Sequence, residues 1–205
     1  TTVHLNPADD SNLSARLKTG RPAAMVELRV VDSEMRDVPR DGVSTGEIVA
    51  RAPWLNEAYL KDADATADLW RGGYLHTGDV GRIENDGSLV ISDRLKDVIK
   101  SGGEWISSMT LESIASAVDG VAEVAGIGIP DPKWGERPLL LVVPVVGADV
   151  ERLPADITAA LKAEIAAGTL SKWALPEWIN IVAELARTSV GKIDKKRLRA
   201  QITPG

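Results

Sequence analysis

A carboxylate beside a glycine is the first feature of this sequence that could do chemistry. Residues 73–79 read GYLHTGD and end in Asp79. Gly78 can adopt a positive φ angle and Asp79 can cap a turn, so a turn is expected here. A carboxylate on a rigid turn presents two oxygen acceptors, which suits the two hydroxyls of a ribose. The ordinary alternative is a turn without a ligand, and this motif alone favours it.

A second group of charged residues and glycines follows. Residues 93–97 read DRLKD and residues 100–105 read KSGGEW. The simplest interpretation of the first segment is a solvated charge cluster at the end of a strand. The second is a strand that leads into a glycine pair, for which a β-turn is the simplest interpretation. Lys100 could meet a phosphate, and Trp105 could equally belong to the core or to the wall of a ligand channel.

The third motif, residues 187–192, reads RTSVGK and places Lys192 after a glycine. A Walker phosphate loop needs two glycines and a Ser or Thr after the lysine, whereas Ile193 follows here, so that interpretation is rejected. A lysine in such a segment is more commonly exposed in a basic tail. The basic residues that would form this tail with it are Lys195, Lys196, Arg197 and Arg199.

The composition is that of an ordinary globular protein and excludes several functions. Hydrophobic residues make up 44% and charged residues 26% of the 205 residues, and the net charge is −6. The acidic balance predicts no general attraction for nucleic acid. The absence of cysteine excludes disulfides and thiolate chemistry, and it fits a cytoplasmic protein. Only two histidines occur, which argues against a histidine metal site or a serine–histidine triad.

The N-terminal sequence and the apolar segments bear on processing and location. The chain starts with TTVHL, without an initiator Met or a signal-peptide pattern, and is expected to be part of a longer protein. No apolar run approaches the ~20 residues that a transmembrane helix needs.

The periodicity of apolar residues predicts an α+β fold in two parts. Strands are expected at residues 25–32 and 46–51, followed by a hairpin with strands 80–83 and 88–92 around an Asn-Asp-Gly turn. The second part alternates strands and helices. Helices are predicted at 110–118, 153–167 and 195–201, and strands at 121–129, 139–146 and 178–182. The boundary is expected at residues 93–96.

Together, the three motifs resemble the C-terminal third of the adenylate-forming enzymes, which include acyl-CoA synthetases, luciferases and the adenylation domains of peptide synthetases. The resemblance extends from about residue 17 to residue 199. Residues 101–112, 130–138 and 172–176 look most like the medium- and long-chain fatty acyl-CoA synthetases. The implied fold is a β-barrel-like remnant of the large AMP-binding domain at residues 1–93. A small mobile C-terminal α/β domain is implied at residues 94–205.

The resemblance implies a role for each motif residue. Asp79 and Arg94 would hold the nucleotide, and Lys96 would be the hinge about which the C-terminal domain turns. Lys192 would bridge the substrate carboxylate and the α-phosphate during adenylation. Ala186 stands where the family usually has proline, which slightly weakens the expected loop geometry. The segment expected to line the coenzyme A tunnel comprises Lys100, Ser101, Gly102, Gly103, Glu104 and Trp105.

The activity implied by the resemblance is the conversion of a fatty acid, ATP and coenzyme A into acyl-CoA, AMP and diphosphate. The phosphate loop and the segment expected to supply a Mg²⁺ ligand are not found, so no metal ligand is assigned. The N-terminal body of the same enzyme is the expected partner, the parent enzyme could form a homodimer, and the fragment alone is expected to be inactive. Two alternatives remain open: loading of a carrier protein, and a noncatalytic binding fragment.

Overall fold

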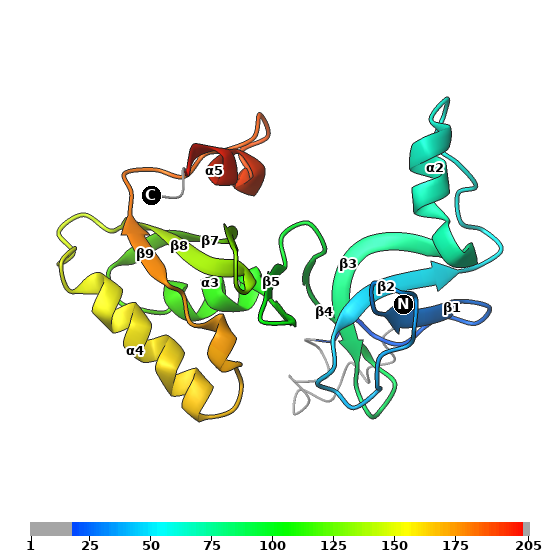
Figure 1. Ribbon diagram of the computed structural model, residues 1–205, viewed down its shortest axis with the longest axis horizontal. Coiled ribbons are helices and arrows are strands. Elements are labelled where there is room, and N and C mark those ends of the chain that lie inside the picture. Colours follow the sequence, from blue (N-terminus) through cyan, green and yellow to red (C-terminus); the bar gives the residue numbers. More distant parts are fainter. Residues whose placement is uncertain (1–17, 203–205) are drawn as a thin grey trace, which may run out of the picture. The chain divides into compact units, whose positions relative to one another are not determined.

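The computed structural model describes residues 18–202 (Figure 1). The chain divides into two compact units between Lys96 and Asp97, close to the boundary expected between residues 93 and 94. The first residues of the expected N-terminal domain, including the starting sequence, lie outside the described range.

The first unit is built on a four-stranded antiparallel sheet whose order follows the sequence. Its strands are β1 (Glu27–Val31), β2 (Gly46–Arg51), β3 (Leu75–Ile83) and β4 (Leu89–Arg94). Both faces of the sheet carry small apolar clusters, one with Ile48 and the other with Val49, as the alternation of side chains along a strand requires. The four strands form an open sheet with β1 and β4 at its edges, and do not by themselves make a closed barrel.

The predicted hairpin between β3 and β4 is confirmed. Gly87 has a φ of 80°, which the tight turn requires, and the amide of Ser88 donates to the Asp86 carboxylate at 2.9 Å. That bond, together with the Lys18 ammonium 3.0 Å away, lowers the pKa of Asp86 to about 2. The Asn-Asp-Gly turn therefore fixes the register of β3 and β4, the two strands that carry Asp79 and Arg94.

A short helix, α2 (Ala63–Leu69), lies between β2 and β3 and was not expected from the sequence. None of its residues is buried, so it has no apolar periodicity to reveal it. Its first turn is fixed by Asp62, whose carboxylate accepts from the amide of Ala65 at 2.9 Å. A 3₁₀ turn, η1 (Arg71–Gly73), then leads into β3.

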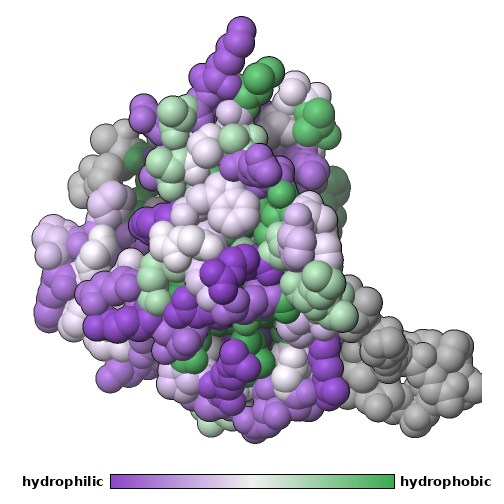
Figure 2. All heavy atoms as spheres, turned by 90° about the vertical axis from the view of Figure 1, so that its right-hand side faces the viewer, coloured by the Kyte–Doolittle hydropathy of each residue, from purple (hydrophilic) through white to green (hydrophobic). Residues whose placement is uncertain are grey.

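Hydrophobic side chains on the face shown in Figure 2 are scattered among hydrophilic ones.

The second unit has a five-stranded sheet with β8 at its centre. Strand order is β6-β5-β8-β7, and β9 pairs with β8 in parallel. The strands are β5 (Ile99–Ser101), β6 (Glu104–Ile106), β7 (Val121–Asp131), β8 (Gly135–Pro144) and β9 (Trp178–Ile181). Successive β8 residues point to opposite faces of the sheet, so Leu140 and Val142 lie in one apolar cluster and Leu139 and Leu141 in the other.

Helices cover both faces of this sheet (Figure 1). α3 (Ser108–Ser116) and α4 (Leu153–Ala166) pack on the face that carries Leu140 and Val142. α5 (Lys195–Gln201) places Leu198 on the other face, against the cluster that contains Ile127, Leu139 and Leu141. A 3₁₀ turn, η2 (Lys172–Ala174), precedes β9. The three helices predicted in this unit are confirmed, and no helix among residues 18–202 is long and apolar enough to cross a membrane.

Candidate functional site

Asp79 lies within β3, whereas the sequence suggested a turn. The register between β2 and β3 shifts so that Ile48 lies opposite a three-residue stretch that ends at Asp79. Gly78 has a φ of 68°, and the Thr77 hydroxyl donates to the Ile48 carbonyl at 2.7 Å. The amide of Asp79 donates to the same hydroxyl at 3.1 Å. The positive φ of Gly78 and the bond to Asp79 expected for a turn are present, but they form a β-bulge inside a paired strand. A β-bulge can change the direction in which a side chain points.

Asp79 and Arg94 are brought together across the β3–β4 pair. They are register partners, and the Arg94 Nε atom lies 2.9 Å from the Asp79 Oδ1 atom. The arginine side chain is 62% exposed and the carboxylate 23% exposed, so solvent screens this ion pair. Both groups therefore remain accessible to a polar ligand.

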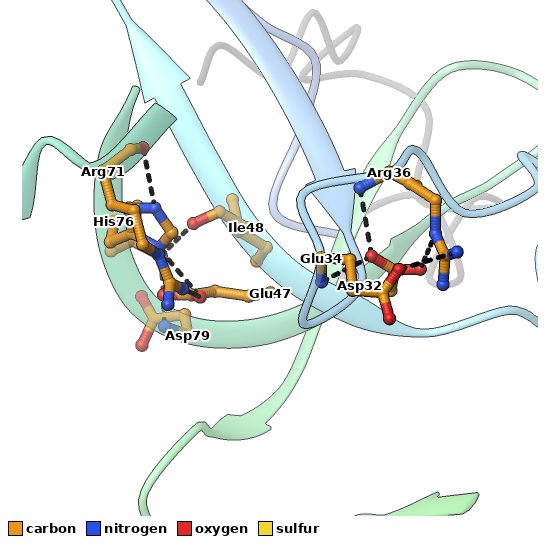
Figure 3. Close-up of polar contacts among 9 residues, drawn as sticks. Asp32, Glu34, Arg36, Glu47, Ile48, Arg71, His76 and Asp79 are labelled. Atoms are coloured by element: carbon orange, nitrogen blue, oxygen red, sulfur yellow. Dashed lines mark hydrogen bonds and ion pairs between the residues drawn. The ribbon is translucent and has the colours of Figure 1, made fainter. Parts of the chain in front are cut away.

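A histidine–carboxylate pair, which was not singled out from the sequence, lies close to this site, with His76 three residues before Asp79 on β3 (Figure 3). The His76 Nδ1 atom is 2.9 Å from Glu47 on β2, and its Nε2 atom is 3.1 Å from the Arg71 carbonyl. Glu47 is buried, with an exposed fraction of 5%, and the Arg71 guanidinium is 4.0 Å from its carboxylate. These contacts fix the start of β3 against β2, just before the bulge that carries Asp79.

Lys96, the expected hinge, is the last residue of the first unit. It lies in a turn between β4 and β5, and its side chain is exposed. Its neighbour Leu95 is tied to the first unit by a bond from its amide to the Gly78 carbonyl at 2.8 Å. On the other side, Asp97 pairs with Arg199 of α5 within the second unit at 3.3 Å. Lys96 thus lies between two anchored residues.

The segment from Lys100 to Trp105 forms a tight hairpin between β5 and β6. Lys100 pairs with Trp105 and Ser101 with Glu104, which leaves Gly102 and Gly103 as the two turn residues. Both glycines have positive φ angles, 61° and 83°, as a two-residue hairpin turn of this type requires. The Lys100 ammonium lies 5.0 Å from the centre of the Trp105 ring, and Trp105 is only partly buried.

Residues distant in sequence hold this hairpin in place. The Lys100 amide donates to Glu136 at 2.8 Å, and the Gly102 amide donates to the Trp134 carbonyl at 3.0 Å. A Cβ atom on Gly102 would lie 2.8 Å from the ring of Trp173. Arg137 reaches the Ser101 hydroxyl at 3.4 Å and the carbonyl groups of η2 and its neighbour. Sequence reasoning missed Glu136 and Arg137 as supports because no local pattern marks them.

Lys192 lies at the end of a small exposed hairpin. Arg187 pairs with Ile193, and the Thr188 amide donates to the Lys192 carbonyl at 2.8 Å. The lysine side chain is exposed. The alternative of a solvated basic tail is wrong for two of its members. Lys195 is 12% exposed and paired with Glu112, and Arg199 is paired with Asp97.

The candidate residues fall into three local groups. Asp79, Arg94 and Lys96 belong to the first unit, whereas the Lys100–Trp105 hairpin and Lys192 belong to the second. Within residues 18–202, no three His, Cys, Asp or Glu side chains are placed to hold a metal ion together.

Known proteins resemble both units. The chain is 42% identical over 184 residues to the 3-methylmercaptopropionyl-CoA ligase of Ruegeria lacuscaerulensis, covering 90% of this chain and 32% of that enzyme. It is 41% identical over 195 residues to the long-chain-fatty-acid–CoA ligase of Thermus thermophilus, covering 95% of this chain and 35% of that enzyme. The chain thus spans about a third of the length of these curated relatives.

A solved structure gives the same picture. ATP-bound MatB from Rhodopseudomonas palustris superposes with a TM-score of 0.73 at 29% identity, over 90% of this chain and 35% of MatB. Residues 110–192, which run from within α3 past β9 and include Lys192, match the AMP-binding enzyme C-terminal domain. The chain therefore carries the C-terminal domain of the adenylate-forming, AMP-binding enzymes, and its relatives include acyl-CoA ligases.

Proposed function

We propose that this chain is the C-terminal portion of a fatty acyl-CoA synthetase that works through an acyl-adenylate. In this proposal, residues 1–93 are the end of the large AMP-binding domain, a remnant of its β-barrel, and residues 94–205 are the mobile domain. The observation that carries the proposal is the Asp79–Arg94 pair. Two motif residues from different strands lie 2.9 Å apart, and both are open to solvent. A carboxylate and a guanidinium side by side suit a ribose diol and a phosphate.

The proposed reaction has two steps. In the first, a carboxylate oxygen of the fatty acid attacks the α-phosphorus of ATP, and diphosphate leaves. In the second, the thiol of coenzyme A attacks the acyl carbonyl carbon, loses its proton, and AMP leaves with the bonding electrons. Each step is accelerated only by groups that bind its transition state more tightly than its ground state.

Lys192 is assigned to the first step. Attack on phosphorus concentrates negative charge on the equatorial oxygens, where a cation stabilises the transition state most strongly. The exposed lysine at the end of its hairpin is free to enter a site formed with the rest of the enzyme. The Lys100–Trp105 hairpin is assigned to the second step. Gly102 and Gly103 leave room for the thin thiol-bearing arm of coenzyme A beside the backbone.

The proposal also concerns which carboxylic acid is the substrate. The relatives include a long-chain-fatty-acid–CoA ligase and, at similar identity, a 3-methylmercaptopropionyl-CoA ligase. The second name favours a short sulfur-containing acid as a second candidate substrate. An enzyme that loads the phosphopantetheine arm of a carrier protein would present the same thiol arm to the hairpin, so the acceptor must be tested too.

Acyl-CoA formation is the direct test. The chain would be assayed alone and mixed with the N-terminal body of its parent, using ATP and Mg²⁺. The acids would be a ladder of fatty acids and 3-methylmercaptopropionate. The acceptors would be coenzyme A and a phosphopantetheinylated carrier protein. We expect acyl-CoA only in the mixture, since positioning of both substrates needs the missing pockets. A folded chain that yields no thioester with either acceptor would overturn the proposal and favour a noncatalytic role.

Lys192→Ala gives a residue-level test in the same mixture. The rate of adenylation, measured as diphosphate release, should fall about 100-fold or more. Loss of one preorganised hydrogen-bond donor typically lowers kcat by a factor of ~10²–10³. Thioester formation from supplied acyl-adenylate should change little. Lys196→Ala, which removes an exposed lysine from α5, is the matched control and should affect neither step. Equal losses in both half-reactions would rule out the assigned role of Lys192.

A further inference from the structure

The tip of the hairpin that carries Lys192 has almost no packing of its own. Val190 is 76% exposed, and a Cβ atom built on Gly191 would meet no atom within 4 Å. Lys192 itself is exposed. Because these three tip residues are exposed, the position of the tip depends on how the base of the hairpin is attached to the unit.

Hydrogen bonds within the hairpin hold its two sides together, so the tip moves with the base. The amide of Thr188 donates to the Lys192 carbonyl at 2.8 Å, and the amide of Asp194 donates to the Ala186 carbonyl at 2.8 Å. Arg187 donates to the Gly191 carbonyl at 2.8 Å. These bonds close the loop between Ala186 and Asp194, so a shift at its base moves Lys192 as well.

One attachment is an ion pair on the incoming strand of the hairpin. The Arg187 Nη2 atom lies 2.6 Å from Glu123 on β7, and the two side chains are 46% and 40% exposed. Both residues line an open pocket of about 470 Å³. Solvent reaches this pair and screens it, so it is the weaker attachment.

The other attachment follows Lys192 directly and is much better shielded. The Lys195 ammonium lies 2.6 Å from the Glu112 Oε1 atom on α3 and donates to the Ser108 hydroxyl at 2.7 Å. The same carboxylate oxygen accepts from the Gly126 amide of β7 at 2.7 Å. The side chains of Lys195 and Glu112 are 12% and 20% exposed, so their attraction is less screened by water. The Glu112 carboxylate of α3 therefore joins α5 and β7 at one point.

α5 needs such a fixed point because it is short. It has seven residues, too few to be a stable helix without tertiary contacts. Leu198 buries the helix against the sheet, but apolar burial is not directional and does not set the rotation of the helix. A charge-assisted contact at the first residue of α5 does set it, and it also fixes the end of the hairpin three residues earlier.

We propose that Lys195, through its contact with Glu112 and Ser108, is a positioning residue for Lys192 and so serves the adenylation step in particular. This inference rests on the proposed function, in which Lys192 acts in adenylation only. The Lys100–Trp105 hairpin is assigned to thioester formation, and its own supports, the Glu136 carboxylate and the Trp134 carbonyl, are not residues of α5. Loss of the Lys195 contact should therefore slow adenylation much more than thioester formation.

The test uses two measurements. Amide hydrogen exchange of this chain would compare the wild type with Lys195→Met, which keeps the apolar stem and removes the charge. Adenylation and thioester formation would then be measured separately in the mixture with the N-terminal body. Lys195→Arg restores a cation, and Lys196→Met removes an exposed charge from the same helix without touching Glu112. Glu123→Gln weakens the exposed attachment and serves as a second variant should Lys195→Met fail to fold.

We expect faster exchange at the amides of Thr188 and Asp194 in Lys195→Met, with the β8 amides unchanged. Adenylation should fall about 10- to 100-fold, since a displacement of ~1 Å can cost 10²-fold, and thioester formation should fall less than about twofold. Lys195→Arg should recover most of the adenylation rate, Lys196→Met should match the wild type, and Glu123→Gln should show a smaller loss of the same kind.

Several results would overturn the inference. Unchanged exchange in the hairpin would show that Lys195 does not hold it. Equal losses in both half-reactions would reduce Lys195 to a general structural role. Should Lys195→Met not fold, an effect of Glu123→Gln on both steps alike, or on neither, would decide against it. A wild-type mixture without any acyl-CoA formation would instead contradict the proposed function, while the exchange data would still decide whether Lys195 holds the hairpin.

Discussion

At the scale of single residues, the least expected feature is the environment of His76. Both of its ring nitrogens face oxygen acceptors, one from the buried Glu47 carboxylate and one from the Arg71 carbonyl. The ring therefore connects β2, β3 and the turn before β3 (Figure 3). The neighbouring Thr77 begins the bulge that orients Asp79, so this contact supports the candidate nucleotide site from inside the first unit.

Two substitutions separate the roles of His76 and Glu47. His76→Leu removes one partner of the Glu47 carboxylate, whose side chain is 7% exposed, and leaves the Arg71 guanidinium 4.0 Å away. A buried charge that loses its partner typically costs about 3 kcal/mol or more. Glu47→Gln keeps a side chain that can still bond to the ring, so we expect a loss of about 1 kcal/mol.

Urea unfolding, followed by NMR signals of β3, would measure both losses. Glu57→Gln removes an exposed carboxylate from the same unit and should change the free energy of unfolding by less than about 0.5 kcal/mol. Similar losses for His76→Leu and Glu47→Gln would mean that the cost comes from altered packing and not from the unpartnered carboxylate.

At the scale of elements, the two glycines of the β5–β6 hairpin differ in how much space surrounds them. Both have positive φ angles, but only Gly102 faces a neighbour, the Trp173 ring. Gly103→Ala should cost about 1–2 kcal/mol, the penalty for a left-handed residue with a side chain. Gly102→Ala should cost about 1–3 kcal/mol more, because its Cβ atom would lie 2.8 Å from that ring.

Thermal or urea unfolding of the two alanine variants would test this difference. Gly103→Ala is the matched control, since it shares the backbone penalty and has no atom within 4 Å of the added methyl group. Equal destabilisation of the two variants would show that the contact with Trp173 does not constrain the turn.

The sequence predicted best those elements whose signals are local. The bounds of β2 and α5 agree with the predicted ranges, and α4 ends one residue before its predicted end. Pro154 in the first turn of α4 and the Asn-Asp-Gly turn before β4 identify their elements without reference to the rest of the fold. The resemblance assigns Asp79 and Arg94 to the same nucleotide, but only the structure shows that they are register partners.

The features that were missed depend on long-range contacts or lack an apolar pattern. α2 buries no residue and therefore has no periodicity. Lys195 looked like a member of a solvated basic run, because its partner Ser108 lies 87 residues earlier in the chain. The Thr77–Asp79 bulge was taken for a free turn, since glycine and aspartate have the same local preferences in both settings.

At the scale of the whole molecule, the chain divides into two units directly after Lys96, the residue that is proposed as the hinge. Leu95 is bonded to the first unit and Asp97 to the second, which leaves Lys96 as the residue between two anchored neighbours. Hinges absorb large φ and ψ changes at a few residues that end an element. An exposed charged residue suits such a position, because its side chain stays in water whichever way the backbone turns.

Lys96→Pro tests the hinge, because proline fixes φ near −65° and restricts the residue before it. With the N-terminal body present, a fixed hinge should support one half-reaction at close to the wild-type rate. The other half-reaction, and with it overall acyl-CoA formation, should fall about tenfold or more. Lys96→Ala removes the charge but keeps the backbone free, so it should retain both half-reactions. If Lys96→Pro keeps both steps, or loses both to the same extent, rotation about Lys96 is not what alternates between adenylation and thioester formation.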